Sequence, residues 1–461
     1  MIEKLFKLNE NGTTVKTEVI GGLTTFMTMA YILAVNPSLL GNEFGAGMDP
    51  TAVLIATCLA SFVGTLAMAL LANYPFALAP GMGLNAYFSF TVCGAMGYSW
   101  KVALMAVFIE GLIFIVLSLT SVREAIFDAI PSTLKKGVSA GIGLFIAFIG
   151  LQGAHLVVAN DSTLVSYVDF AGNWHTQGIC ALLALIGLFI TAILYIKHVK
   201  GSILIGILAT WVLGMLAQAA GIYTMDVENG FYSLYPSMTF TDFTSIGKTF
   251  GQCFTADFGN IRIFDFIVVL LSFLFVDMFD TIGTLIGVSS KADMLDKDEK
   301  LPRIKPALLA DAIATSVGAV FGTSTTTTFV ESSAGVGEGA RTGLASVVTG
   351  FLFLLAIFFA PIFTAIPGFA TAPALIFVGF LMVSAILKVD FDDLTEAIPA
   401  YLCLIAMPLM YSISEGIAIG VISYVVINVI CNLSKDAKDK KKITPLMYVL
   451  AVLFVCKYIF L

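Results

Sequence analysis

The chain has 461 residues, of which 58% are hydrophobic and only 12% are charged, and its mean hydropathy is +0.96. Soluble domains carry about 25% charged residues, so this composition excludes an ordinary soluble protein and predicts a membrane protein. The formal net charge is −7 and no long basic patch precedes the Lys-rich tail, so we expect no nucleic-acid partner.

Apolar segments recur along the chain with short breaks, at lengths suited to crossing a bilayer. Residues 1–16 are polar and charged, so we expect no cleavable signal peptide. The apolar segments predict an all-α polytopic membrane protein with 14 transmembrane spans over residues 17–40, 51–73, 81–97, 102–120, 136–152, 177–196, 202–219, 263–288, 304–321, 331–341, 343–366, 371–388, 395–411 and 414–433.

Three connecting or terminal segments carry expectations of their own. Residues 121–135 predict a short amphipathic surface helix, and the polar, aromatic residues 221–262 predict an external loop. The last segment, 434–461, is a cytoplasmic basic stretch followed by an apolar tail. That tail, 443–461, is long enough for a fifteenth span, but we favour an interfacial helix.

The positive charges test this map. If the N-terminus is cytoplasmic, all but four of the 24 Lys and Arg residues fall on the cytoplasmic side. The exceptions are Lys101, Lys248, Arg262 and Lys457. Cytoplasmic loops of membrane proteins are enriched in Lys and Arg, so we expect both termini to be cytoplasmic.

Two spans are interrupted at matching places. Residues 73–88, at span 3, and residues 322–337, at span 10, each combine a short extended stretch with a Gly-rich half-helix. Spans 3 and 10 are equivalent if the chain is a seven-plus-seven repeat, and an odd number of spans inverts the second half. Inverted repeats with broken helices are typical of secondary transporters, whose solute site lies where the broken helices meet.

Three acids lie within the apolar segments, namely Asp277, Asp280 and Glu331. A carboxylate in hydrocarbon costs on the order of 3 kcal/mol, so such groups mark a polar cavity with a function. Asp277 and Asp280 are three residues apart and share a helical face. No Lys or Arg lies near these acids, which indicates a neutral or proton-linked solute. A fourth acid, Asp311, is expected to brace the segment of span 10 by hydrogen bonding.

Three strings stand out, namely APGMGLNAYF at 79–88, FVDMFDTIGT at 275–284 and TTFVESSAG at 327–335. Together they resemble the nucleobase–ascorbate transporter (xanthine/uracil permease) family, and more closely its adenine/guanine/hypoxanthine permease branch, within a likeness that runs from about residue 13 to 433. The resemblance implies a homodimer in the cell membrane that imports purine nucleobases with protons by an elevator-like movement of a core domain against a gate domain.

The core domain would comprise spans 1–4 (17–121) and 8–11 (263–366). The gate domain would comprise spans 5–7 (122–220) and 12–14 (367–433). Both assignments rest on the resemblance alone.

The same resemblance assigns site residues. Gly83 and Asn85 match the contact motif of the third span, Asp280 matches the acid of the eighth, and Glu331 matches the acid of the tenth. Asp277 is the additional acid of the purine branch. Thr284 departs from the uracil and xanthine branches, which place His or Asp there, so those solutes are disfavoured.

The chemistry of a purine fits these side chains. An ionised carboxylate only accepts hydrogen bonds, so Glu331 is suited to the N–H and NH₂ groups of guanine or the N1–H of hypoxanthine. Phe88, Phe279 and Phe329 are candidates for flat apolar contact. Burial disfavours a charged carboxyl group, so Asp277 or Asp280 is suited to exchanging a proton as its access to water changes.

Other classes of protein remain as alternatives. The Asp277-x-x-Asp280 pattern also suits an intramembrane enzyme that holds Mg²⁺ with a diphosphate, but neither a second acidic cluster nor basic residues lie nearby. An anion exchanger of the same fold needs a cation at its site, and a uracil or xanthine permease is the third alternative. We predict a transporter rather than an enzyme, with no cofactor and no metal site.

Overall fold

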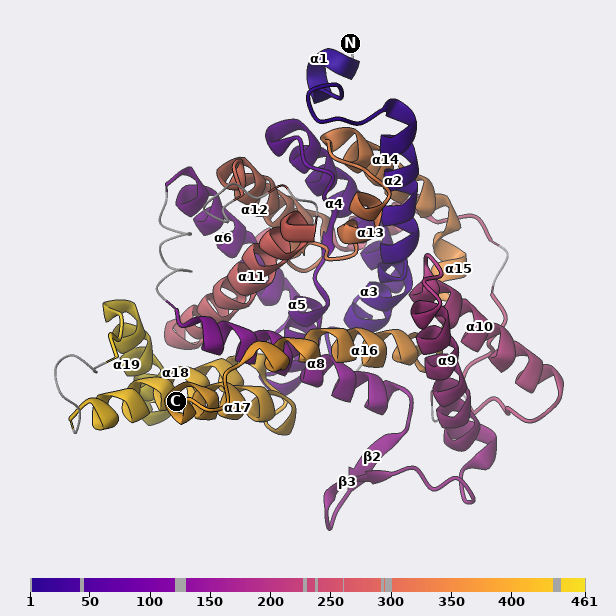
Figure 1. The fold of residues 1–461 in the computed structure, drawn as a ribbon. Coiled ribbons are helices and arrows are strands. Elements are labelled where there is room, and N and C mark those ends of the chain that lie inside the picture. The colour runs from indigo at the N-terminus through magenta and orange to yellow at the C-terminus, as the bar shows by residue number, and fades with distance from the viewer. Residues whose placement is uncertain are drawn as a thin grey trace.

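The computed structural model describes residues 2–41, 45–120, 130–226, 230–236, 239–259, 261–291, 294, 301–433 and 441–460. These residues form a bundle of crossing helices with two short antiparallel strand pairs (Figure 1). Within the described residues, 10 helices are long and apolar enough to cross a membrane. The expected class is therefore confirmed, whereas the count of 14 spans stays a prediction.

The first half of the chain contains the elements that cover expected spans 1–7. In order they are α1 (Ile2–Phe6), α2 (Val15–Met29), α3 (Ile32–Leu40), α4 (Pro50–Ala67), η1 (Met68–Ala72), β1 (Leu78–Pro80), α5 (Met82–Ala86), η2 (Tyr87–Ala95), α6 (Trp100–Leu119), α8 (Ser132–Gly153), β2 (Val157–Asn160), β3 (Leu164–Tyr167), η3 (Trp174–Gly178), α9 (Ile179–Ile196) and α10 (Ser202–Ala219). The surface helix expected at 121–135 lies largely outside the described residues, and α8 begins near its end.

The second half contains the elements that cover expected spans 8–14 and the tail. In order they are η5 (Phe243–Lys248), η6 (Gln252–Thr255), α11 (Ile263–Lys291), α12 (Ile304–Phe321), β4 (Thr326–Thr328), α13 (Ser332–Gly337), α14 (Gly343–Ala356), η7 (Ile357–Phe359), α15 (Ala360–Thr364), α16 (Gly368–Val383), η8 (Ser384–Lys388), α17 (Leu394–Leu409), α18 (Ile413–Leu433) and α19 (Pro445–Phe460).

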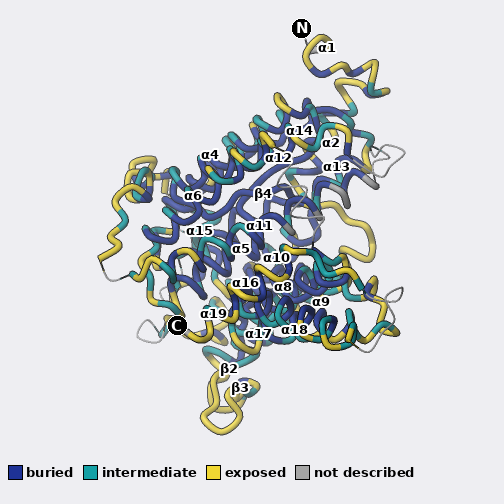
Figure 2. Tube along the Cα trace, turned by 90° about the vertical axis from the view of Figure 1, so that its left-hand side faces the viewer, coloured by how far each residue is buried: buried dark blue, intermediate teal, exposed yellow. Residues whose placement is uncertain are grey.

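The two interrupted segments form one structure. Strands β1 and β4 pair antiparallel, with Leu78 opposite Thr328 and Pro80 opposite Thr326. Each strand leads into a short helix, α5 after β1 and α13 after β4, as the sequence predicts. The strand pair is buried at the centre of the bundle (Figure 2).

Side-chain hydroxyls satisfy the outer edges of this strand pair. The hydroxyl of Thr65 on α4 accepts from the backbone N–H of Leu78 at 2.9 Å and lies 3.2 Å from its carbonyl. On the other edge, the Thr315 hydroxyl of α12 donates to the carbonyl of Thr326 at 3.0 Å. Backbone N–H and C=O groups on an unpaired strand edge are costly within the membrane, because no water is there to form hydrogen bonds with them.

The long helices pack as two groups. The first packing group comprises α2–α6 and α11–α14, and the second comprises α8–α10 and α16–α18. The two groups meet where α5 and α11 contact α8, and also where α2 contacts α10, α3 contacts α16 and α11 contacts α18. Within the second group, Gly143 and Gly379 bring α8 and α16 together, because a Cβ on Gly379 would lie 2.5 Å from the carbonyl oxygen of Gly143. Small residues permit such close crossings in membranes.

Two features outside the spans differ from expectation. A β-hairpin, β2–β3, projects from the end of α8 and is largely exposed (Figure 2), where the sequence analysis assigned no strand. Its turn is built by Asn160, whose side-chain oxygen accepts from the N–H groups of Ser162 and Thr163. The loop expected at 221–262 contains the short helices η5 and η6.

The apolar tail forms helix α19, which packs against α18 (Figure 1). The Tyr458 hydroxyl donates to the carboxylate of Glu415 on α18. Before α19, Lys441 pairs with Asp393 and with Glu396, at 3.0 Å for Glu396. The tail is thus tied to the second packing group, and its depth in the membrane stays a prediction.

The N-terminus of α14 is capped by a buried acid. Glu18 of α2 is fully buried, and its carboxylate accepts from the N–H groups of Arg341 (2.8 Å), Thr342 (3.3 Å) and Ala345 (3.2 Å). The first N–H groups of a helix have no partner within it, and a carboxylate there also meets the positive end of the helix dipole. Glu18 therefore joins α2 to α14.

Glu18→Ala is expected to destabilise the fold by about 1.5–3 kcal/mol, since it leaves three backbone donors without their charged acceptor. Thermal unfolding in detergent measures this loss. Glu10→Ala is the matched control, because Glu10 only pairs with exposed Lys7 at 3.1 Å, a contact of little value. Equal melting temperatures for the two variants would refute the capping role of Glu18.

Candidate functional site

The expected site residues lie around the β1–β4 crossing, but they divide into two kinds of contact. Some side chains tie the interrupted segments to one another, as Asn85 does, and others, such as Asp280 and Glu331, lie beside the crossing.

Asn85 belongs to the first kind. It is fully buried on α5, its Oδ1 accepts from the Ser324 hydroxyl, and its Nδ2 lies 3.4 Å from the carbonyl oxygen of Pro80. Its amide thereby cross-links the two interrupted segments. Asn36 does the same between α3 and the start of the second segment, donating to Thr57 at 2.7 Å and Thr323 at 2.9 Å.

Two acids converge on the hydroxyl of Thr281 on α11. Its Oγ1 lies 2.9 Å from Oδ1 of Asp277, and 3.1 and 3.0 Å from the two carboxylate oxygens of Asp311 on α12. It also lies 2.7 Å from the hydroxyl of Thr327 in β4. The expected bracing by Asp311 is therefore realised through Thr281. Because one hydroxyl carries a single proton, it donates to only one of the two acids at a time.

Glu331 stands just before α13 and meets a residue that the sequence analysis did not single out. The hydroxyl of Tyr31 donates to Oε1 of Glu331 at 2.6 Å. Tyr31 is fully buried between α2 and α3, and its ring is tilted against Phe329 with centroids 6.5 Å apart. The structure thus brings Glu331 and Phe329 together with span 1.

Asp280 is partly exposed and lies beside the start of α5. A Cβ on Gly81 would lie 3.4 Å from Oδ2 of Asp280 and 2.7 Å from the methyl group of Thr327, so only glycine leaves room there. Gly83 is close-packed in the same way, because a Cβ there would lie 2.7 Å from the Ile142 side chain of α8. Gly83 thus marks the contact between the two packing groups.

The remaining candidates are apolar or peripheral. Phe88 is fully buried, with its ring centroid 6.4 Å from that of Phe273. Thr284 follows Asp280 by one helical turn and is partly exposed. The side chain of Phe279 lies outside the described part of the structure.

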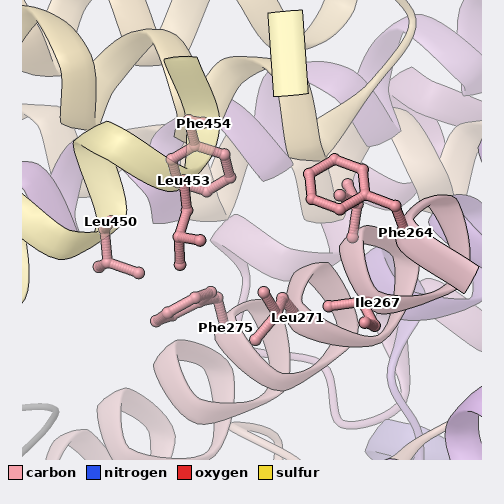
Figure 3. Close-up of a pocket in the computed structure, with 8 residues that line it drawn as sticks. Phe264, Ile267, Leu271, Phe275, Leu450, Leu453 and Phe454 are labelled. Carbon is pink, nitrogen blue, oxygen red and sulfur yellow. The ribbon is translucent and has the colours of Figure 1, made fainter. Parts of the chain in front are cut away.

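An apolar cavity separates α11 from α19 on another side of the molecule (Figure 3). Phe264, Leu271 and Phe275 line it from α11, and Leu450 and Phe454 line it from α19. Asp277 follows Phe275 by two residues and so points to the opposite side of the helix. Helix α11 therefore separates this cavity from the acids.

Sequence reasoning missed Tyr31, Thr281 and Ser324 as contacts of the acids and of Asn85. Hydroxyl residues are common in membrane helices, and nothing in the spacing of Tyr31 or Ser324 marks them. Thr281 offers a partial signal, because it lies four residues after Asp277 and hence on the same helical face.

Comparisons with known proteins agree with one another. The family model Xan_ur_permease, described as "Permease family", matches residues 16–448. The guanine/hypoxanthine permease PbuG of Bacillus subtilis (strain 168) is 46% identical over 467 residues, covering 100% of both chains. The adenine permease AdeP of Escherichia coli (strain K12) is 42% identical over 463 residues, covering 100% of this chain and 96% of the relative.

The fold also has a solved counterpart. The transmembrane domain of the cyanobacterial bicarbonate transporter BicA superposes with a TM-score of 0.62, covering 88% of this chain and 97% of that domain. Its sequence identity is only 16%, so the likeness concerns the fold alone.

The junction at Thr281 leads to a prediction. Thr281→Val keeps the shape of the side chain but removes the hydroxyl that Asp277, Asp311 and Thr327 share, so we expect a loss of about 1–3 kcal/mol in stability and a matching loss of uptake. Unfolding in detergent and uptake by cells measure the two effects. Thr191→Val is the control, since the buried Thr191 hydroxyl donates to the Gly187 carbonyl of its own helix, at 2.9 Å. A Thr281 variant as stable and active as this control would show that the junction is not needed.

Proposed function

The chain belongs to the permease family and is a multi-pass membrane transporter rather than an enzyme, and from this premise we propose that it imports purine nucleobases by proton symport. The candidate solutes are guanine, hypoxanthine and adenine, which the names of its relatives also mention. The proposal is carried by one observation. Glu331 and Asp280 both flank the β1–β4 crossing, where two half-helices begin.

The acidic side chains at the β1–β4 crossing support a purine as the solute. Neither 264–288 nor 322–337 contains a Lys or Arg, so the crossing offers acceptors without an opposing cation from these segments. An ionised carboxylate pairs with N–H groups, and a purine edge presents N–H and NH₂ donors. An anionic solute would be repelled by the same acids.

The contacts around each acid suggest different roles. Asp280 lies next to Gly81 at the crossing, where a solute would be held between α5 and α11. Asp277 is fully buried against Thr281 and shares that hydroxyl with Asp311. We therefore assign Asp280 and Glu331 to the solute, and Asp277, coupled to Asp280, to the exchange of a proton. Gly83, Phe88, Phe279 and Thr284 complete the proposed site, with Asn85 holding its frame.

The two packing groups suggest how the solute would cross. We identify the first group with a core, residues 17–121 and 263–366, and the second with a gate, residues 122–220 and 367–433, related by a seven-plus-seven inverted repeat of 14 spans. The contact of Gly83 with Ile142 lies on the boundary between them. Movement of the core along the gate would carry the crossing, with its solute, from one side of the membrane to the other. The proposal places the protein in the cell membrane as a homodimer with both termini in the cytoplasm.

Replacing Glu331 tests the solute site. Glu331→Gln keeps the size of the side chain but turns one acceptor into a donor that would face the purine N–H. A lost hydrogen bond to a charged group costs about 1.5–3 kcal/mol, so guanine affinity should fall about 10- to 100-fold. Competition of unlabelled bases against labelled guanine measures it. Glu338→Gln, on an acid that pairs with Lys200 outside the crossing, is the control. Undiminished guanine affinity in Glu331→Gln would remove this acid from the site.

A second experiment addresses the proton. Asp277→Asn and Asp280→Asn, reconstituted separately in vesicles under a pH gradient, should lose gradient-driven accumulation of guanine, because an amide does not take up the coupled proton. The Asp277 variant should retain exchange of labelled for unlabelled guanine, whereas the Asp280 variant should also bind guanine more weakly. A protonophore provides the control for the gradient. If both variants concentrate guanine like the wild type, these acids are structural and the proposed coupling is wrong.

A further inference from the structure

Span 1 is broken at the residue that reaches Glu331. Helix α2 ends at Met29 and α3 begins at Ile32, so Tyr31 lies at the interruption. Its hydroxyl donates to Oε1 of Glu331 at 2.6 Å, and the Thr28 hydroxyl lies 3.4 Å from the carbonyl oxygen of Glu331. The interruption of span 1 therefore holds the side chain of this acid, whereas the nearer partners of the Thr28 hydroxyl are the carbonyls of Thr24 and Thr25 in its own helix, at 3.0 and 2.9 Å.

The hydrogen bond from Tyr31 bears on the state of the carboxyl group. A distance of 2.6 Å falls in the range typical of an O–H donor on a charged carboxylate, about 2.5–2.7 Å. A donated hydrogen bond stabilises the ionised carboxyl over the neutral one. Tyr31 thus favours the ionised form of Glu331, which only accepts hydrogen bonds, against the burial that favours the neutral acid.

Purines differ in what they offer to such an acceptor. Guanine and hypoxanthine carry a hydrogen on N1, so this edge of their ring donates to an ionised carboxylate. In adenine, N1 is itself an acceptor beside a donating amino group, and this edge is matched by a protonated carboxyl that both donates and accepts. The ionisation of one acid is therefore enough to separate the two kinds of base.

We propose that Tyr31 is a positioning residue that sets purine specificity, favouring bases that donate from N1 over adenine through its hydrogen bond to Glu331. The inference rests on the proposed role of Glu331 in binding the solute. It concerns which purine is preferred, whereas the proposed function concerns purines as a class.

The test is competition of guanine, hypoxanthine and adenine against one labelled purine in the wild type and in Tyr31→Phe. Removing the hydroxyl should weaken the binding of guanine and hypoxanthine about tenfold, which is the effect of one hydrogen bond to a charged group. The affinity for adenine should be unchanged or higher. The shift in preference should be greatest near neutral pH and shrink in acid, where Glu331 is protonated in both proteins. If the affinities for all three bases fall by the same factor, or if none of them changes, the proposal is overturned.

Two further proteins make the result decisive. Tyr223→Phe is the matched control, because this buried tyrosine donates to the carbonyl of Tyr232 at 2.7 Å away from the crossing, and it should leave all three affinities unchanged. If Tyr31→Phe does not fold, fluorotyrosine incorporated at position 31 keeps the shape but donates more strongly. It should move the preference toward guanine, and an unchanged preference would overturn the proposal.

The two proposals fail in different ways. If Glu331→Gln binds guanine more weakly, while Tyr31→Phe changes the affinities for all three bases by the same factor, only the role of Tyr31 is wrong. If Glu331→Gln binds guanine normally, the acid is not in the solute site, and both the proposed site and the role of Tyr31 are wrong. If the wild type takes up none of the three purines, the proposed function itself is wrong.

Discussion

The arrangement depends on how two interrupted spans satisfy their backbone inside a membrane. Hydrocarbon offers no hydrogen bonds, so extended chain at this depth needs a partner for every N–H and C=O group. Strands β1 and β4 pair with each other, with Ala79 opposite Thr327 at the centre. Thr65 and Thr315 serve their outer edges, and Ser324 ties the second segment to Asn85. Because this crossing is fixed from both sides, the acids around it are held at defined positions.

The acids around this crossing also need hydrogen-bond partners, because their carboxyl groups are buried or partly buried. Asp277 and Asp311 share the hydroxyl of Thr281, and Glu331 is held by Tyr31. These bonds reduce the cost of burying carboxyl groups, which is large when they lack partners. In the proposed site, carboxylate oxygens at the crossing would accept from the N–H groups of the solute. The same hydrogen bonds therefore support both the fold and the proposed binding of a purine.

Much of this was accessible from the sequence because its physical causes are local. Apolar length predicts spans, and a Pro–Gly or Thr-rich interruption predicts extended chain, so both β1–α5 and β4–α13 were expected. The pairing between them was not, because it joins residues about 250 positions apart. For the same reason Tyr31 was missed, and Asn85 was assigned to the solute although its amide is engaged by Ser324. The β2–β3 hairpin was missed because its strands are short and exposed and have no apolar face to reveal them.

The central claim is that the acids at the β1–β4 crossing bind the transported base. An experimental structure of the protein with guanine bound tests it most directly. We expect the base to lie beside the crossing, with its N1–H and NH₂ groups within hydrogen-bond distance of the Glu331 carboxylate. Guanine bound away from Glu331 and Asp280, for example in the apolar cavity between α11 and α19, would contradict it.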